Sequence, residues 1–158
     1  AKTYDRKGNL QTEVATVKSK ITHVKSYYDN GKLQFAVPYK NGKRDGVEKY
    51  YSKAGKLLRA TTYKAGVKDG LQKDFFENGA LKTETMYRAG KAHGTQKTYT
   101  VTHQMIWEKP WAEGTLEGEV KSYWPETGKI QSLAVYKAGK KVGKTRFYDK
   151  NGKFVREE

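Results

Sequence analysis

The chain has 158 residues, of which 35% are hydrophobic, and its formal net charge at pH 7 is +15. Its mean hydropathy of −0.95 is too polar for a thick central core, and no apolar run approaches the roughly 20 residues that span a bilayer. Disorder is the first alternative for so polar a chain, but the 13% aromatic content argues against it, because disordered chains contain few aromatic residues. We therefore expect a thin structure that buries its rings locally.

The excess of basic residues leaves two interpretations open. The chain has 32 Lys and Arg residues against 17 Asp and Glu. This charge suits an anionic partner, such as nucleic acid, an anionic membrane surface or an acidic protein. It equally suits the solubility of a long, exposed sheet. The sequence contains no cysteine and shows no signal peptide, so we expect neither disulfides nor thiolate chemistry.

A unit of 24 residues repeats along the chain. The stretch "YKNGKRDGVEKYY" from Tyr39 returns as "YKAGVKDGLQKDFF" from Tyr63 and as "YRAGKAHGTQKTYT" from Tyr87. Three series of glycines keep this period, with one extra residue near 124–129; they are Gly31, Gly55, Gly79, Gly128 and Gly152, then Gly42, Gly66, Gly90, Gly114 and Gly139, then Gly46, Gly70, Gly94, Gly118 and Gly143. A fixed period of this length is the mark of a repeat architecture.

The first regular unit, residues 28–51, predicts one β-hairpin. Its apolar residues alternate with period two from Leu33 to Tyr39, which is typical of a strand. The loop 40–46 then supplies the Gly and Asp residues that favour turns. A second short strand is expected over 47–51. Successive units should therefore pair into an antiparallel meander.

We predict a single all-β domain over residues 1–158, built as one elongated antiparallel sheet of about six stacked hairpins with about twelve strands. The expected order is a degenerate N-terminal unit (1–27), regular units (28–51, 52–75 and 76–99), a divergent unit (100–123), a regular unit (124–148) and a C-terminal cap (149–158). Degenerate end units are expected of caps in a stacked array. Pro38 and Pro110 occupy the same unit position, late in a strand, and predict edges, bulges or unpaired ladder sites there.

Equivalent residues of such units should line up in rows. Cross-strand aromatic pairs contribute up to about 1 kcal/mol each, so rows of rings should stabilise the sheet. A row of lysines does not help the fold, and is either tolerated because its ammonium groups fan into water or used to hold an anion. The expected aromatic ladders are Tyr39, Tyr63, Tyr87, Trp111 and Tyr136, and Tyr27, Tyr51, Phe75, Tyr99, Tyr123 and Tyr148; the basic ladder is Lys49, Lys73, Lys97, Lys121 and Arg146.

The stretch "YKNGKRDGVEKYYSKAGKL" resembles the bacterial variant of the MORN repeat (membrane occupation and recognition nexus). The resemblance covers Tyr28 to Tyr99 and Trp124 to Phe154. It implies β-hairpins stacked into an elongated, twisted sheet or groove. Proteins with this variant are often described as antitoxins or immunity proteins of bacterial toxin systems, and other MORN proteins have been linked to anionic lipids or to assembly scaffolds. It favours a bacterial protein of the periplasm or cell surface over a cytoplasmic one.

The sequence offers little for catalysis. A nucleophilic mechanism needs Ser or Cys beside His and an acid, yet Cys is absent and His23, His93 and His103 lie in three different units. His93 and His103 occupy turn positions, where His tolerates left-handed dihedrals. We predict no enzymatic activity, no cofactor and no metal site.

The best enzymatic alternative is a paired-carboxylate hydrolase. Glu113, Glu117 and Glu119 cluster near Trp107 and Trp111, and two carboxylates beside aromatic rings can cleave a glycosidic bond. Carboxylates are mostly surface groups, however, so we expect a solvated acidic loop that balances nearby lysines.

The divergent unit carries the candidate contact residues, because Trp is enriched in binding hot spots. At the position of Trp107 the other units have Phe35, Arg59 and Thr83, so the position does not demand a large ring. Trp111 is expected to be a larger ring in the first aromatic ladder. The predicted partner-binding residues are His103, Trp107, Trp111, Glu113, Glu117 and Trp124.

We therefore expect a non-enzymatic protein-binding module. By the resemblance, its partner is a cognate toxin or effector, or an assembly component, with an acidic contact surface. Two alternatives stay open: a peripheral module that binds anionic lipid, and a structural or surface scaffold that extends through its sheet edges. Nucleic acid is not expected, since the charge is spread around each unit and no known binding motif is present.

Overall fold

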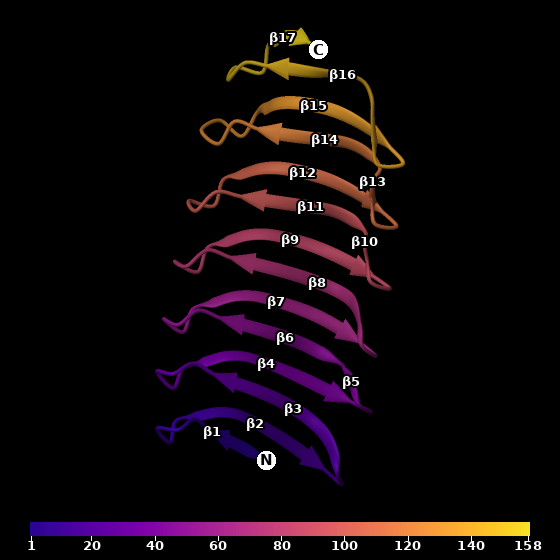
Figure 1. Cartoon of the computed structure of the whole chain (residues 1–158). Helices are drawn as coiled ribbons and strands as arrows, with labels where there is room; N and C mark the ends of the chain where they lie inside the picture. Colours follow the sequence, from indigo (N-terminus) through magenta and orange to yellow (C-terminus); the bar gives the residue numbers. More distant parts are fainter. The chain divides into compact units, whose positions relative to one another are not determined.

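In the computed structural model, which describes residues 1–158, the chain forms 17 β-strands and no helix (Figure 1). The strands belong to two compact units, Ala1–Gly79 and Ala80–Glu158. There is accordingly no helix that could cross a membrane. The all-β prediction is confirmed.

The first unit contains eight strands that pair antiparallel in chain order. They are β1 (Lys2–Tyr4), β2 (Leu10–Val17), β3 (Lys20–Tyr27), β4 (Leu33–Lys40), β5 (Lys43–Arg44), β6 (Gly46–Tyr51), β7 (Leu57–Lys64) and β8 (Val67–Phe75). Strands β2 and β3, β4 and β6, and β7 and β8 form three successive hairpins, and β1 lies along the start of β2.

The second unit contains nine strands with the same antiparallel pairing. They are β9 (Leu81–Arg88), β10 (Lys91–Ala92), β11 (Gly94–Tyr99), β12 (Met105–Ala112), β13 (Thr115–Leu116), β14 (Gly118–Tyr123), β15 (Ile130–Lys137), β16 (Lys140–Tyr148) and β17 (Phe154–Glu157). Its three hairpins bring the total to the six that the repeat predicts.

A bulge interrupts the return strand in three hairpins, which raises the strand count above the prediction. Asp45 lies between β5 and β6, and its N–H donates to the Pro38 carbonyl oxygen at 3.0 Å. Gly46 follows with a φ of +111°, and a Cβ there would lie 3.0 Å from Pro38 Cγ. The late-strand proline therefore faces a bulge, as predicted. Joining the split strands and setting aside β1 and β17 leaves about twelve strands.

The two irregular units keep the backbone of the regular ones. The second half of the N-terminal unit has lost its glycines, yet Lys18 and Ser19 adopt the left-handed φ values of 47° and 62° and close the β2–β3 hairpin. In the divergent unit, strands β12, β13 and β14 have the bounds of β4, β5 and β6 moved by three repeats. The divergent unit therefore differs from the regular units in its side chains and not in the positions of its strands.

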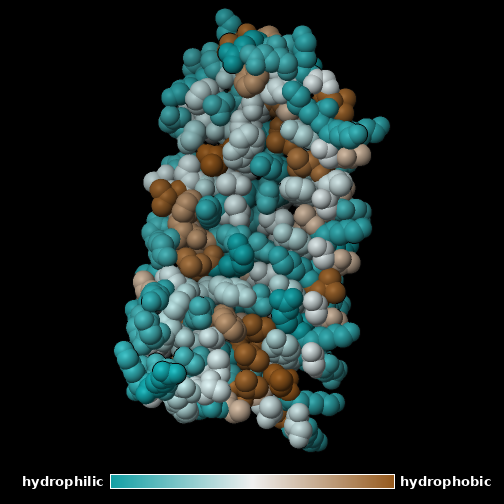
Figure 2. Space-filling model, in the orientation of Figure 1, coloured by the Kyte–Doolittle hydropathy of each residue, from teal (hydrophilic) through white to brown (hydrophobic).

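Within each unit the strands make a single layer, so side chains are buried by neighbours on the same face. Cross-strand partners Glu48 and Thr61 are only 4% and 2% exposed, and Val37 is 5% exposed. The buried Glu48 carboxylate is paired with Arg44, whose guanidinium lies 3.2 Å away. On the face shown in Figure 2, apolar side chains form separate patches between polar ones. The buried apolar residues are few, namely Val37, Tyr63, Ala80 and Val120.

The predicted aromatic ladders are interrupted by residues of the intervening strands. Equivalent positions lie two strands apart, about 9–10 Å, which is too far for direct ring stacking. Instead, the Arg44 guanidinium carbon lies 4.1 Å from the ring centroid of Tyr63. The ring pair Phe35–Tyr50, with centroids 5.8 Å apart, joins adjacent strands rather than ladder neighbours.

Candidate protein-binding face

Trp107 lies in the middle of β12 with small cross-strand neighbours on both sides. Its partners are Thr98 on β11 and Ser122 on β14. Neither side chain is large enough to cover an indole, and Trp107 is 37% exposed. The structure therefore presents this ring on an open strand face of the second unit.

Lys109 lies two residues further along β12, on the same face as Trp107. Its counterparts in the other units are Val37, Thr61 and Thr85, which are only 5%, 2% and 4% exposed. A lysine at this place cannot bury its ammonium group, and its Nζ lies 5.1 Å from the ring centroid of Trp107. The sequence prediction missed Lys109, although comparison with the chain's own repeats would have found it.

The other two tryptophans are half-buried, and Trp124 makes a contact that recurs in the repeat frame. Trp124 Nε1 donates to the Tyr148 carbonyl oxygen at 3.0 Å, as the Tyr28 hydroxyl donates to the Tyr51 carbonyl oxygen at 2.8 Å. Trp111 is half-buried, and its buried Nε1 has no hydrogen-bond partner.

The remaining predicted residues lie in turns at both ends of β12. His103 adopts a φ of 69° in the turn before the strand, and Glu113 lies in the turn after it, with Oε2 3.4 Å from Lys91 Nζ. Glu117 Oε2 accepts a hydrogen bond from Ala138 N at 2.6 Å. The structure does not gather the six predicted residues into one cluster; it leaves Trp107 as the ring exposed in mid-strand.

The three carboxylates considered for hydrolysis do not converge beside the rings. Glu113 and Glu117 are held by the contacts above. Glu119 Oε2 lies 3.0 Å from Lys121 Nζ. Because Ser122 faces Trp107 across the strands, Glu119 three residues earlier points to the opposite face. No group of three or more His, Cys, Asp or Glu residues could hold a metal ion.

The predicted basic ladder has a different setting in each unit. In the first unit, Ala60 separates Lys49 from Lys73 in register, so no carboxylate stands between them. In the second unit, Glu108 separates Lys97 from Lys121. Arg146 follows Leu133 and faces Glu157, with Nε 4.0 Å from the carboxylate. The second unit therefore has a row of alternating charges rather than a cationic stripe.

A tyrosine hydroxyl binds a glutamate on the same face in three hairpins. The pairs are Tyr27 with Glu13 at 3.0 Å, Tyr99 with Glu84 at 3.2 Å, and Tyr123 with Glu108 at 2.5 Å. Burial, and then the hydrogen bond to Glu108, raise the pKa of Tyr123 far above its usual value. One hairpin has neither group, with Ala60 and Phe75 at these positions, and another keeps Tyr51 although Ala36 replaces the glutamate.

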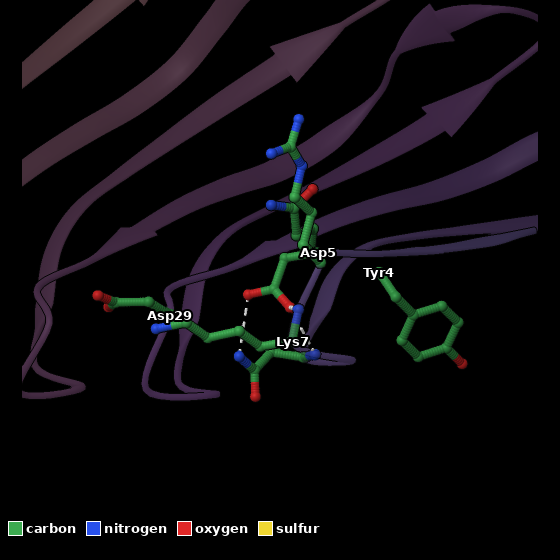
Figure 3. A pocket seen from close by; sticks show the side chains of 7 residues that line it. Tyr4, Asp5, Lys7 and Asp29 are labelled. Carbon is green, nitrogen blue, oxygen red and sulfur yellow. Dashed lines mark hydrogen bonds between the residues drawn. The ribbon is translucent and has the colours of Figure 1, made fainter.

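A depression at the start of the chain is lined by Tyr4, Asp5, Lys7 and Asp29 among others (Figure 3). The Asp5 carboxylate accepts hydrogen bonds from Lys7 N at 2.8 Å and from Asn9 Nδ2 at 2.9 Å. The side-chain hydrogen bond from Asn9, aided by backbone N–H groups, lowers the pKa of Asp5. The Asp5 carboxylate therefore stabilises its own turn.

His93 predicts a stabilising substitution. Asp45 is the residue equivalent to His93 in an earlier repeat, and its Oδ2 accepts a hydrogen bond from Ala65 N at 3.0 Å. The buried His93 Nδ1, in contrast, has no hydrogen-bond partner. Since a buried unsatisfied polar group costs about 1–3 kcal/mol, His93→Asp should raise the free energy of unfolding by about 1 kcal/mol in urea titrations. Asp45→Ala should lower it by a similar amount. A His93→Asp midpoint at or below that of the wild type would contradict this assignment.

A sheet of repeated hairpins, with rows of side chains on its faces, defines the chain as a β-hairpin repeat protein. Residues 22–41, 44–65 and 68–89 match the family model of the MORN repeat variant. These three segments are therefore similar to the MORN repeat variant, as the resemblance predicts.

Other similarities are more distant. The crystal structure of TarM is similar over 66% of this chain and 20% of the TarM chain, with 14% sequence identity and a TM-score of 0.41. This chain thus spans about a fifth of the TarM chain. No curated protein matches the sequence.

Proposed function

We propose that this chain is a non-enzymatic protein-binding module whose partner contacts Trp107 and Lys109. One observation carries the proposal: a 37% exposed tryptophan stands where the chain's own repeats form the same hairpin with Phe35, Arg59 or Thr83. The ring is therefore not required by the frame. A single exposed indole among small side chains is the form that binding hot spots take.

Lys109 supports the same face. Its ammonium group lies 5.1 Å from the Trp107 ring centroid, and such cation–π contacts contribute about 0.5–1 kcal/mol at exposed sites. The contact restricts the indole before binding, which lowers the entropy cost of association. It also adds positive charge at the centre of the proposed contact.

The finer proposal is that the partner is a cognate bacterial toxin or effector, neutralised when the module covers its active site. The net charge of +15 supports a partner with an acidic contact surface. The same charge supports the alternative of a peripheral module on anionic membranes. The two differ in salt dependence, because dispersed lysines lose their attraction as salt rises and a tryptophan-centred interface does not.

Affinity capture with repeat-matched variants tests the proposal. Trp107→Thr and Lys109→Thr install the residues that the chain itself has at Thr83 and Thr85. Met86 is 40% exposed, and Met86→Thr is the matched control because it installs the residue found at Thr62. A partner should be captured in moderate salt by the wild type and the control, and Trp107→Thr should weaken its binding by roughly 30-fold.

Thermal unfolding of each variant separates lost contacts from lost structure. Capture of a stoichiometric protein encoded beside this chain, and inhibition of that protein's activity, would support the toxin assignment. Equal capture by Trp107→Thr and wild type would refute the proposed face. Binding only to anionic vesicles, abolished by salt, would favour the membrane alternative.

A further inference from the structure

At two of the two-residue turns, Ala65–Gly66 and Ala138–Gly139, the preceding hairpin supplies hydrogen-bond acceptors for both turn amides. Ala65 N donates to the Asp45 carboxylate at 3.0 Å, and Gly66 N donates to the Arg44 carbonyl oxygen at 2.7 Å. The second unit repeats this arrangement. There, Ala138 N donates to the Glu117 carboxylate at 2.6 Å, and Gly139 N to a backbone carbonyl oxygen at 2.9 Å.

The turn Asn41–Gly42 lacks these acceptors. It has the same left-handed backbone, with φ values of 51° and 75°, but neither amide N–H has a hydrogen-bond partner. Thr22 occupies the place of Asp45, three residues after the second turn residue of its own hairpin. Its hydroxyl donates to the Ala15 carbonyl oxygen at 3.3 Å and leaves the Asn41 amide unpaired.

Two adjoining hollows, which share Lys20, Ile21, Tyr39 and Asn41, lie between this turn and the turn Lys18–Ser19 and are described together as one open depression. Its apolar wall is formed by Tyr39 with Val17 and Ile21, which are 61% and 41% exposed. Its cationic lining is formed by Lys18, Lys20 and Lys40, none of which makes an ion pair. No carboxylate lines the depression.

We infer that this depression, the Asn41 site, binds a carboxylate of a protein partner, an Asp or Glu side chain that is followed by an apolar residue. The carboxylate accepts from Asn41 N and Gly42 N, as Asp45 accepts from Ala65 N within the chain. The three lysines supply the opposite charge, and the apolar residue packs on Ile21 and Tyr39. The inference rests on the proposed function, since it presumes that the partner is a protein.

The chain's own chemistry favours a carboxylate over other anions. At the equivalent turns the occupant is an Asp or Glu side chain, held at 3.0 and 2.6 Å from the first turn amide. A planar carboxylate can accept from two neighbouring N–H groups at once. The adjoining apolar wall suits a peptide residue, which free phosphate does not offer.

Amide NMR of the full chain tests the Asn41 site with a defined probe. The probe is acetyl-Leu-Glu-Leu-amide, and its neutral control is acetyl-Leu-Gln-Leu-amide. We expect the Asn41 and Gly42 amide signals to shift on titration with the Glu peptide, and the Gln peptide to bind at least tenfold more weakly. Thr22→Asp should place a carboxylate in the site, shift the Asn41 amide without peptide and reduce peptide affinity at least tenfold.

A second variant keeps the inference testable if Thr22→Asp does not fold. The double variant Lys18→Gln with Lys20→Gln should lower the affinity for the Glu peptide severalfold. It should leave the amide signals of Ala65 and Gly66 unshifted. Absent shifts at Asn41 and Gly42, or equal affinity for the Gln peptide, inorganic phosphate or anionic vesicles, would overturn the inference. The titration needs no natural partner, so its failure is distinct from failure of the affinity capture.

Discussion

Replacing Gly70 by alanine will lower the free energy of unfolding of the first unit by about 3 kcal/mol, since strained backbone alone costs about 1–3 kcal/mol per residue. Gly70 follows the bulge of the β7–β8 hairpin with a φ of +120°, which L-residues rarely adopt. A Cβ there would also lie 2.9 Å from Thr62 Cβ. Thr62 cannot swing away without moving its backbone, so clash and strain add.

A graded series within the same unit separates the two causes. Gly46 has a φ of +111° and would place a Cβ 3.0 Å from Pro38 Cγ, the edge of a ring. Gly31 has a φ of +76° and nothing within 4 Å. Urea unfolding should rank Gly70→Ala as the most costly and Gly31→Ala as the least, at about 1 kcal/mol. If Gly70→Ala costs no more than Gly31→Ala, close approach does not explain why glycine stands at positions 46 and 70.

The period of the glycines was sufficient to predict an antiparallel sheet of hairpins. The same turn residues and the same strand alternation recur in successive units, so each unit supports the hairpin interpretation of the others. The prediction of a strand from Leu33 to Tyr39 matches β4 (Leu33–Lys40) for this reason. The N-terminal hairpin was less evident, because Lys18 and Ser19 adopt left-handed backbones without being glycine.

The residues that lie between equivalent side chains of successive repeats depend on strand register, which a repeat period does not reveal. The period places Lys97 and Lys121 in one row, but only the pairing of β11, β12 and β14 places Glu108 between them. The basic ladder of the second unit therefore looked like a cationic stripe. In the first unit Ala60 stands at the corresponding place, so the charge of Lys49 and Lys73 is not offset there.

The candidate site was predicted in part, for the same physical reason. Trp107 could be singled out because its own repeats show that the frame does not require it. The structural role of Glu117 could not be predicted, because its carboxylate accepts a hydrogen bond from the turn amide of Ala138, 21 residues later in the sequence. Sequence alone does not distinguish a turn carboxylate that is used by the next hairpin from one that faces solvent.

Breaking the Tyr123–Glu108 hydrogen bond will produce the second large effect. Glu108 accepts from the half-buried Tyr123 hydroxyl at 2.5 Å and lies between Lys97 and Lys121 in register. Hydrogen bonds to charged groups contribute about 1.5–3 kcal/mol, so Glu108→Ala should cost about 2 kcal/mol in urea unfolding. It also removes one of the two carboxylates beside Lys97 and beside Lys121, and leaves a tyrosine hydroxyl without its acceptor.

The double variant should cost less than the two single changes together. Glu108→Ala with Tyr123→Phe recreates the Ala60 and Phe75 combination that the chain already uses. We expect a coupling energy of about 1–2 kcal/mol, because each single change leaves one polar partner unsatisfied and the double change leaves none. Glu108→Gln keeps a hydrogen-bond acceptor and removes the charge. It therefore measures how much of the lost free energy of unfolding comes from the attraction between Glu108 and the two lysines. Strict additivity would mean that tyrosine and glutamate occur together in three hairpins without stabilising one another.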